Sequence, residues 1–358
     1  MVERIIEITD DKYHYSSGYY TVNKWIDKEN VVLARSEKQT IGAADVPRDD
    51  KTELVKCNVY TGEKEVLCND VMAYQEYLVY KNLLYYVDGE RLIRINLDTK
   101  EREVIFEKKG ICCPHITNDG KVISFYIESE NGGVYTMEAR DNLKERPVEF
   151  LAIDVESGNE LYSFKKSFEK PLNWAAHGMV CPENPELMFF CHEGNTFYVS
   201  NRLWLYDNKT KNQWNIAKQR LDDDGNLGDC YGHEMWAPDG KGLYFVKYIC
   251  SPKPPRGICY VDVQTGKAEL LYSAFNYWHV GVSSDGNYLT SDTQTGKDYS
   301  EVILINRKTG EETLIDSAKT DWMHPCHPHP QISPDNKKIM YTALTDKGRT
   351  CVKIALLK

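Results

Sequence analysis

The sequence of 358 residues lacks several signals that mark large classes of proteins. It has no apolar run long enough to cross a bilayer, and its first residues show no basic segment followed by an apolar one, so we expect no membrane span and no export signal. It also lacks an excess of basic charge, because 44 lysines and arginines stand against 54 acidic residues, a formal net charge of −10. We therefore do not expect a basic face that binds nucleic acid.

Paired cysteine motifs and nucleotide or hydrolase motifs are absent as well. The eleven cysteines are odd in number and form no CxxC pair, which predicts free thiols in a reducing cytoplasm and not a disulfide framework or a zinc ribbon. There is no GxSxG and no glycine loop that would cradle a phosphate, so serine hydrolases and nucleotide enzymes are not favoured. A small molecule or a protein is the expected partner.

Helical periodicity is missing too, while strand and turn signals recur along the whole chain. No window sustains a 3.6-residue apolar period with caps, whereas short β-branched and aromatic runs between turn residues are typical of strands. Two kinds of turn repeat, and the first needs residues that tolerate positive φ. The first kind lies at residues 118–120, 238–240, 284–286 and 334–336, and the second at 61–62, 98–99, 157–158, 209–210, 265–266, 309–310 and 347–348.

The spacing of the second kind of turn predicts the architecture. Its seven members follow one another at intervals of roughly 40 to 60 residues, the range of propeller blades. A single blade cannot bury both of its faces and needs neighbours, so the pattern predicts seven four-stranded blades around a central channel. We expect an all-β, seven-bladed β-propeller that forms one domain over residues 1–358. A pair of β-sandwiches is the alternative.

Three of the nine histidines, His324, His327 and His329, lie close together near the end of the sequence. In an extended chain, His327 and His329 point to the same side, about 6.5 Å apart. The prolines between them cannot donate ladder hydrogen bonds, which places the segment in a loop or at the start of a strand. Neutral imidazoles at this spacing predict a site for manganese, iron, zinc or copper. The alternative is a run of surface histidines with no ligand.

Two further histidines occupy comparable positions at the start of strands in the two preceding blades. His279, in residues 277–280, would supply a ligand from a neighbouring blade. His233, in residues 230–236, would lie near the metal without binding it and could act as a general base. For each residue the alternative is a purely structural histidine, packed in the core or hydrogen-bonded in a loop.

An arginine that follows a strand in the middle of the chain is suited to bind an anion. His192 ends one predicted strand, and Arg202 begins the next between aromatic residues. The guanidinium of Arg202 could contact a carboxylate with two parallel hydrogen bonds. A surface ion pair is the structural alternative for this residue.

Taken together, these motifs resemble those of the oligogalacturonate lyases, cytoplasmic seven-bladed propellers that split short pectic oligosaccharides by β-elimination. Residues 327–335 look like the metal-binding signature of that family, and His279 matches its ligand from the preceding blade. The segment around His233 looks like the one that carries the catalytic base. The stretch with His192 and Arg202 is similar to the one whose arginine contacts the substrate.

The resemblance implies a metal-dependent carbon–oxygen lyase that acts on short uronic-acid oligosaccharides in the cytoplasm. His233 would remove the C5 proton, while Arg202 and a divalent metal, expected to be manganese, would neutralise the uronate carboxylate. The partner would be a small acidic oligosaccharide, whose sugar and linkage the sequence does not specify, nor does it specify an oligomeric state. The chain departs from the family at His324, where a glutamine is usual. We expect His324 to be a metal ligand with the histidines at positions 279, 327 and 329.

Two other functions were weighed against the lyase. A non-catalytic propeller that binds a protein or an oligosaccharide is the main alternative, because the propeller fold hosts many functions. A metal-dependent propeller lactonase would favour acidic and asparagine ligands for calcium, and the histidine-rich set argues against it.

Overall fold

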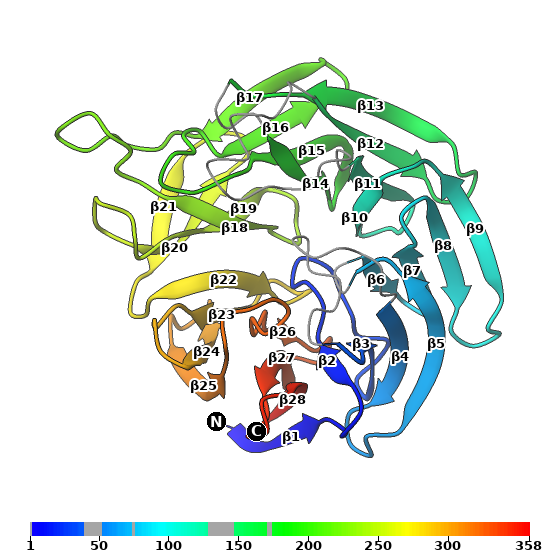
Figure 1. Ribbon diagram of the computed structural model, residues 1–358. Helices are drawn as coiled ribbons and strands as arrows, with labels where there is room; N and C mark the ends of the chain where they lie inside the picture. The colour runs from blue at the N-terminus through cyan, green and yellow to red at the C-terminus, as the bar shows by residue number, and fades with distance from the viewer. Residues whose placement is uncertain (1, 39–51, 74–75, 128–146, 170–173) are drawn as a thin grey trace. The chain divides into compact units, whose positions relative to one another are not determined.

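The described part of the chain, in this computed structural model, is built from seven four-stranded antiparallel sheets (Figure 1). The structure describes residues 2–38, 52–73, 76–127, 147–169 and 174–358. All regular elements within these ranges are β-strands, and none of the described residues forms a helix of the length and hydropathy needed to cross a membrane. The predicted all-β, seven-bladed propeller fold is confirmed.

The described residues group into two compact units. Unit 1 comprises Met1–Asp88, Arg94–Glu103 and Ala274–Lys358, and unit 2 comprises Gly89–Ile93 and Val104–Ser273. The single domain over residues 1–358 stays a prediction.

Unit 1 contains three whole sheets. Their strands are β2 (His14–Ser16), β3 (Asn30–Ser36), β4 (Thr52–Asn58) and β5 (Lys64–Val71); β22 (Tyr277–Val282), β23 (Tyr288–Thr293), β24 (Tyr299–Asn306) and β25 (Glu312–Lys319); and β26 (Gln331–Ile332), β27 (Lys338–Leu344), β28 (Thr350–Leu357) and β1 (Val2–Ile8).

Unit 2 also contains three whole sheets. Their strands are β10 (Ile111–Ile116), β11 (Val122–Ile127), β12 (Val148–Asp154) and β13 (Glu160–Lys166); β14 (Ala175–Cys181), β15 (Asn184–His192), β16 (Leu203–Asp207) and β17 (Asn212–Ala217); and β18 (Tyr231–Trp236), β19 (Gly242–Lys247), β20 (Gly257–Asp262) and β21 (Ala268–Tyr272). The residues of the seventh sheet are divided between the units, and its strands are β6 (Tyr77–Tyr80), β7 (Leu83–Val87), β8 (Arg91–Asn96) and β9 (Arg102–Glu107).

The repeated turns found in the sequence are the turns that connect these strands. At each turn of the first kind, a backbone N–H donates to the carbonyl three residues earlier, as from Gly120 to Thr117 and from Asn336 to Ser333, both at 2.9 Å. At the second kind, the turn places a residue at φ between 61° and 75°. These residues are Gly62, Lys100, Gly158, Lys211, Gly266, Gly310 and Gly348.

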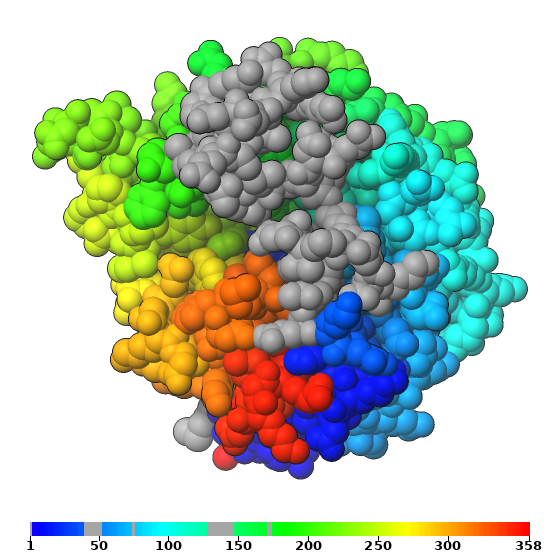
Figure 2. Space-filling view, viewed as in Figure 1, coloured from blue at the N-terminus to red at the C-terminus, as the bar shows by residue number. Residues whose placement is uncertain are grey.

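The sheet that contains both ends of the chain joins the first strand to the last three. β1 pairs with β28 in antiparallel register, with Ile6 opposite Ile354. Tyr15 and Trp25, from the N-terminal residues, lie in one buried apolar cluster with Met340 and other residues of the C-terminal strands. In Figure 2 the blue N-terminal and red C-terminal residues accordingly lie side by side. Burial of this cluster fixes the sheet that follows the histidine segment.

The turn glycines allow a test of the fold. Gly158 has φ +68°, and a Cβ atom there would lie 2.3 Å from the carbonyl oxygen of Ile105. Gly310 has φ +74° with nothing within 4 Å of such a Cβ atom. Gly310→Ala should therefore lose only about 1–2 kcal/mol for the left-handed backbone, while Gly158→Ala should lose clearly more. Thermal or denaturant unfolding measures both, and equal losses would contradict the packing at Gly158.

Candidate functional site

The first strand of four sheets carries a β-bulge at the same place. In β18, Gly232 pairs with Val246 and Met235 pairs with Tyr244, so one extra residue is inserted on the β18 side. The same shift occurs in β10, β14 and β22. Bulges redirect side chains and are common beside active sites. They place His177 of β14 and His233 of β18 at φ +58° and +53°, respectively.

His279 lies in the equivalent bulge of β22, between the paired residues Tyr277 and Val280. It is the third residue of β22, as His233 is the third residue of β18. Within the bulge, however, His279 is the second inserted residue, as Glu234 is in β18, and His233 corresponds to Trp278. The two histidines therefore lie at neighbouring positions of the bulge and not at the same one. The bulge turns the His279 side chain toward the loop that precedes β26.

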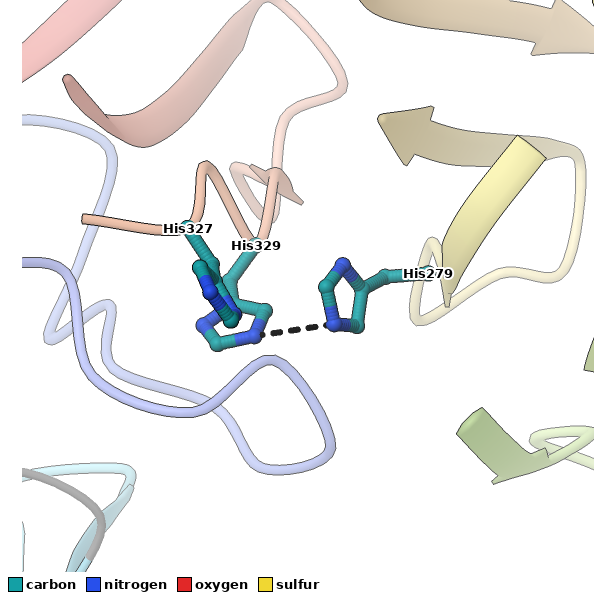
Figure 3. Close-up of side chains that lie close together, drawn as sticks. All are labelled: His279, His327 and His329. Carbon is teal, nitrogen blue, oxygen red and sulfur yellow. Dashed lines mark hydrogen bonds between the residues drawn. The ribbon is translucent and has the colours of Figure 1, made fainter. Parts of the chain in front are cut away.

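His279 meets His327 and His329 in a buried cluster (Figure 3). One ring nitrogen from each of the three histidines lies within 4.8 Å of the other two. All three side chains are buried, with exposed fractions of 1% for His279, 6% for His327 and 1% for His329. Three imidazoles in a dry cluster form a typical set of ligands for a transition metal.

Hydrogen bonds at the outer side of the cluster determine which nitrogens face inward. The Nδ1–H of His279 donates to both carboxylate oxygens of Asp292, at 2.8 and 2.9 Å, which leaves Nε2 as the nitrogen with a lone pair. The Nε2–H of His327 donates to the carbonyl of Trp322 at 3.1 Å, which leaves Nδ1 with its lone pair. Trp322 itself has φ +61°, a conformation rare for a bulky residue, and this backbone aims its carbonyl at His327.

The geometry of the cluster fits a divalent metal. The Nε2 atoms of His279 and His329 are 3.2 Å apart, and two nitrogens bound at about 2.1 Å to one ion would be about 3.0–3.4 Å apart. The Nδ1 atom of His327 is buried and has no hydrogen-bond partner among the described residues. A buried polar atom of this kind normally has a partner, and a metal ion would supply it.

The protonation state of the histidines also suits a metal. Burial, followed by repulsion from His324, lowers the pKa of His279 and of His327 well below the usual value for imidazole. Both rings are therefore neutral at neutral pH, the form that coordinates metals.

His324 lies beside the three-histidine cluster. Its ring centroid is 4.0 Å from that of His327 and 6.3 Å from that of His329. The nitrogens that lie mutually within 4.8 Å belong to the other three histidines. Its role as a fourth ligand stays a prediction.

Arg202 lies in unit 2, in a buried cluster with two glutamates. Its Nη1 and Nη2 atoms donate to the two carboxylate oxygens of Glu193 at 3.1 and 2.9 Å, and its Nε donates to Oε1 of Glu234 at 2.5 Å. Burial disfavours the charged guanidinium, but the two carboxylates outweigh it, so the pKa of Arg202 lies well above its ordinary value. Its two-pronged contact, which we expected a substrate to receive, is made to Glu193.

The surroundings of His233 and His192 differ. The Nδ1 atom of His233 lies 2.9 Å from the hydroxyl oxygen of Tyr248, and this ring is partly exposed. The Nδ1 atom of His192 contacts the carbonyl of Ser200 at 3.1 Å, and its ring stacks on Phe168 with centroids 3.9 Å apart. His192 is thus held as a packed residue, whereas the His233 ring is fixed on one side by a phenol.

The sequence did not reveal the residues that orient this chemistry. Asp292 lies within a run of small polar residues in β23, where alternation alone does not separate a buried carboxylate from a surface one. Glu193, Glu234 and Tyr248 were not singled out, because their partners lie elsewhere in the sequence. The only available signal was an acidic residue flanked by strand-forming residues.

Comparison with known proteins identifies a consistent set of relatives. A family model described as oligogalacturonate lyase matches residues 80–357. The oligogalacturonate lyase of Dickeya dadantii is 24% identical over 299 residues, which cover 76% of this chain and 74% of the relative. The oligogalacturonide lyase of Pectobacterium atrosepticum is 24% identical over 298 residues, with the same coverage.

Solved structures show the same fold. An oligogalacturonate lyase in complex with manganese has a TM-score of 0.79 and 20% identity, covering 99% of this chain and 93% of that one. An oligogalacturonate lyase from Vibrio parahaemolyticus has a TM-score of 0.77 and 17% identity, with the same coverage.

The Asp292 carboxylate should control metal affinity. Asp292→Asn keeps an acceptor for the Nδ1–H of His279 but loses the charge, so we expect metal binding to weaken about 10- to 100-fold. The measurement is titration of the metal-free protein with Mn²⁺. Asp285→Asn, which changes an exposed carboxylate in the turn before β23, is the matched control and should bind as the parent does. Unchanged affinity in Asp292→Asn would show that this carboxylate does not support the metal site.

Proposed function

Because the chain belongs to the oligogalacturonate lyase family, we propose that it cleaves short uronic-acid oligosaccharides by metal-dependent β-elimination. The family to which it belongs makes it a lyase of pectic oligosaccharides. The observation that carries the proposal is the buried cluster of His279, His327 and His329, whose inward nitrogens lie within 4.8 Å of one another.

The metal centre is proposed to bind the uronate carboxylate. His279, His327 and His329 would hold a divalent ion, with His324 as a fourth ligand, and the manganese in a structurally similar lyase supports manganese. When bound, the ion supplies Lewis-acid stabilisation of the negative charge that develops on the carboxylate as the C5 proton leaves. The neutral imidazoles leave the ion its full positive charge for this purpose.

His233 is proposed as the base that removes the C5 proton. Its Nδ1–H would donate to the hydroxyl oxygen of Tyr248, and Nε2 would then accept the proton from carbon. Burial, the largest of several influences, raises the pKa of Tyr248 well above the usual value for a phenol. Tyr248 therefore keeps its proton and orients the imidazole without competing for the substrate proton. The electrons of the broken C–H bond form the C4–C5 double bond as the C4 oxygen departs.

Arg202 is proposed to add positive charge near the uronate carboxylate. A guanidinium has five N–H donors. Three of those of Arg202, one each on Nε, Nη1 and Nη2, are used by the hydrogen bonds to Glu193 and Glu234. The two remaining donors would be available to a carboxylate. Glu193 and Glu234 fix the plane of the guanidinium, so that little conformational freedom is lost when the substrate binds. His192, whose strand runs beside Arg202, would line the same part of the substrate site.

The direct test is product formation from oligosaccharides of defined composition. Metal-loaded protein should convert oligogalacturonates to products with an unsaturated uronate, detected by ultraviolet absorbance, and should leave neutral oligosaccharides intact. His327→Ala should lose bound metal and activity together, because it removes one buried ligand. Metal-loaded parent protein that converts none of a panel of uronic oligosaccharides would refute the proposal.

His233 variants separate the base from the metal ligands. We expect His233→Asn to keep its metal and its substrate affinity while turnover falls by a factor of about 10² to 10⁴. Turnover of the parent should fall toward acid pH as the imidazole takes up a proton, and the residual activity of His233→Asn should lack that limb. Tyr248→Phe, which keeps the ring but not the hydroxyl, should show a smaller loss. A variant without His233 that keeps parental turnover, or that loses metal, would contradict this assignment.

Arg202 requires a conservative substitution. Arg202→Ala would leave two buried carboxyl groups without their cation and should cost about 3–5 kcal/mol of stability, so its activity would report mainly on folding. Arg202→Lys retains the positive charge but loses the planar guanidinium that makes two parallel hydrogen bonds. We expect this variant to have a higher KM and a lower kcat than the parent and to unfold near the parental temperature. Arg220→Lys is the control, because Arg220 is an exposed arginine in the loop after β17. It should leave KM and kcat unchanged. Parental kinetics in Arg202→Lys would remove Arg202 from the substrate site.

A further inference from the structure

Two cysteine thiols lie together at the open end of the β18–β19 hairpin. Cys230 directly precedes β18, and Cys250 lies in the turn that follows β19. The backbone holds these segments side by side, because Tyr248 N–H donates to the Cys230 carbonyl and Cys230 N–H donates to Ser251 Oγ, both at 2.9 Å. The thiols of Cys230 and Cys250 lie close enough for each to shift the pKa of the other.

The two thiols differ in exposure and surroundings. Cys250 is partly exposed, whereas Cys230 is fully buried. The Cys230 thiol and the Thr196 hydroxyl lie close to the Cys250 sulfur and favour its thiolate. The guanidinium of Arg256, whose Nε donates to Ser251 at 2.7 Å, lies close by and attracts a thiolate. Cys250 is therefore accessible to a reagent in solution, whereas Cys230 is buried next to it.

These surroundings favour the thiolate of Cys250. The interaction with the Cys230 thiol is the largest cause that lowers the pKa of Cys250, to about 7, and the same interaction raises the pKa of Cys230. A larger fraction of the Cys250 thiol is therefore ionised at neutral pH than of an ordinary cysteine, which is ionised to only a few per cent. Cys259, a buried cysteine of the same sheet, has its pKa raised to about 12 by burial.

We propose that Cys250 and Cys230 form a peroxide-reactive oxidation site, with Cys250 as the attacking thiol and Cys230 as the resolving thiol. A partly exposed thiolate beside a second thiol is the arrangement that distinguishes redox-sensitive cysteines from inert ones. Neither residue takes part in the proposed lyase chemistry, and the eleven cysteines are free thiols in this structure.

The chemistry balances with a peroxide as the oxidant. The Cys250 thiolate attacks one peroxide oxygen, the O–O bond breaks, and the products are a sulfenic acid and hydroxide, or the alcohol from an organic peroxide. The Cys230 sulfur then attacks the Cys250 sulfur, and the S–O bond breaks with release of water as the disulfide forms. The two electrons and two protons of the dithiol pass to the peroxide. A thiol reductant reverses the cross-link.

The cross-link would close the hairpin that carries His233. Cys230 is three residues before His233, and Cys250 is two residues after Tyr248, which contacts the His233 ring. Oxidation would therefore covalently join the two segments that position this pair.

The test uses the full-length, metal-loaded protein treated with one equivalent of hydrogen peroxide. Free thiols are then blocked under denaturing conditions, and the peptides are mapped by mass spectrometry. We expect the peptide with Cys230 joined to the peptide with Cys250, and separated again by a thiol reductant. Cys250→Ser should abolish the cross-link, whereas Cys230→Ser should stop at a Cys250 sulfenic acid that dimedone traps. Cys113→Ser, which changes another partly exposed cysteine, is the control and should leave the cross-link intact.

The pH dependence of alkylation gives a second readout that does not need oxidation. The rate of Cys250 alkylation in the parent should reach half its maximum near pH 7, and this midpoint should rise in Cys230→Ala, because the Cys250 thiolate loses the neighbouring donor. The proposal is overturned if Cys250 reacts no faster than Cys113 at neutral pH. It is likewise overturned if peroxide yields neither the Cys230–Cys250 cross-link nor, in Cys230→Ser, the sulfenic acid at Cys250.

Discussion

The carboxylate of Asp292 is the interaction on which the histidine cluster depends. One of its oxygens accepts both the backbone N–H and the Nδ1–H of His279, at 2.9 and 2.8 Å, and the other accepts the backbone N–H of His329 at 3.1 Å. A single buried side chain of β23 therefore holds the bulge of β22 against the loop before β26. Hydrogen bonds to an ionised carboxylate are among the stronger ones in proteins. They connect the two segments that carry the three histidines.

The β-bulge extends this logic to other sheets. It inserts His233 and Glu234 into β18 in the way that it inserts Trp278 and His279 into β22. The second bulge residue is Glu234 in one sheet and His279 in the other, and both are buried at 1% exposure. One backbone irregularity thus brings an acidic group to an arginine in unit 2 and an imidazole to the histidine cluster in unit 1. The bulge determines where the second inserted side chain lies, and the residue type at that place, glutamate in β18 or histidine in β22, determines which group it can bind.

Much of the architecture could be predicted because its signals are local. Each turn is specified by two or three residues, so their repetition revealed seven sheets before any contact was known. His327 and His329 were found for the same reason, since they lie two residues apart. Asp292 was missed because its partners are 13 and 37 residues away, and a carboxylate in a polar strand looks the same whether it is buried or exposed. The glutamate partners of Arg202 were missed because only the fold brings Glu234 to it across 32 residues.

The buried carboxylates of the Arg202 cluster and of the histidine cluster are compensated in different ways. Buried carboxylates are costly unless a cation or several donors compensate them. In unit 2 the compensating cation is the Arg202 guanidinium, which cannot leave, so the cluster is complete when the chain folds. In unit 1 the hydrogen bonds to Asp292 from His279 and His329 come from a neutral imidazole and from backbone amides, and burial keeps the imidazoles of His279 and His327 uncharged. Neutral imidazoles can bind and release a cation without a large change of charge in the protein, which is the property that a metal centre requires.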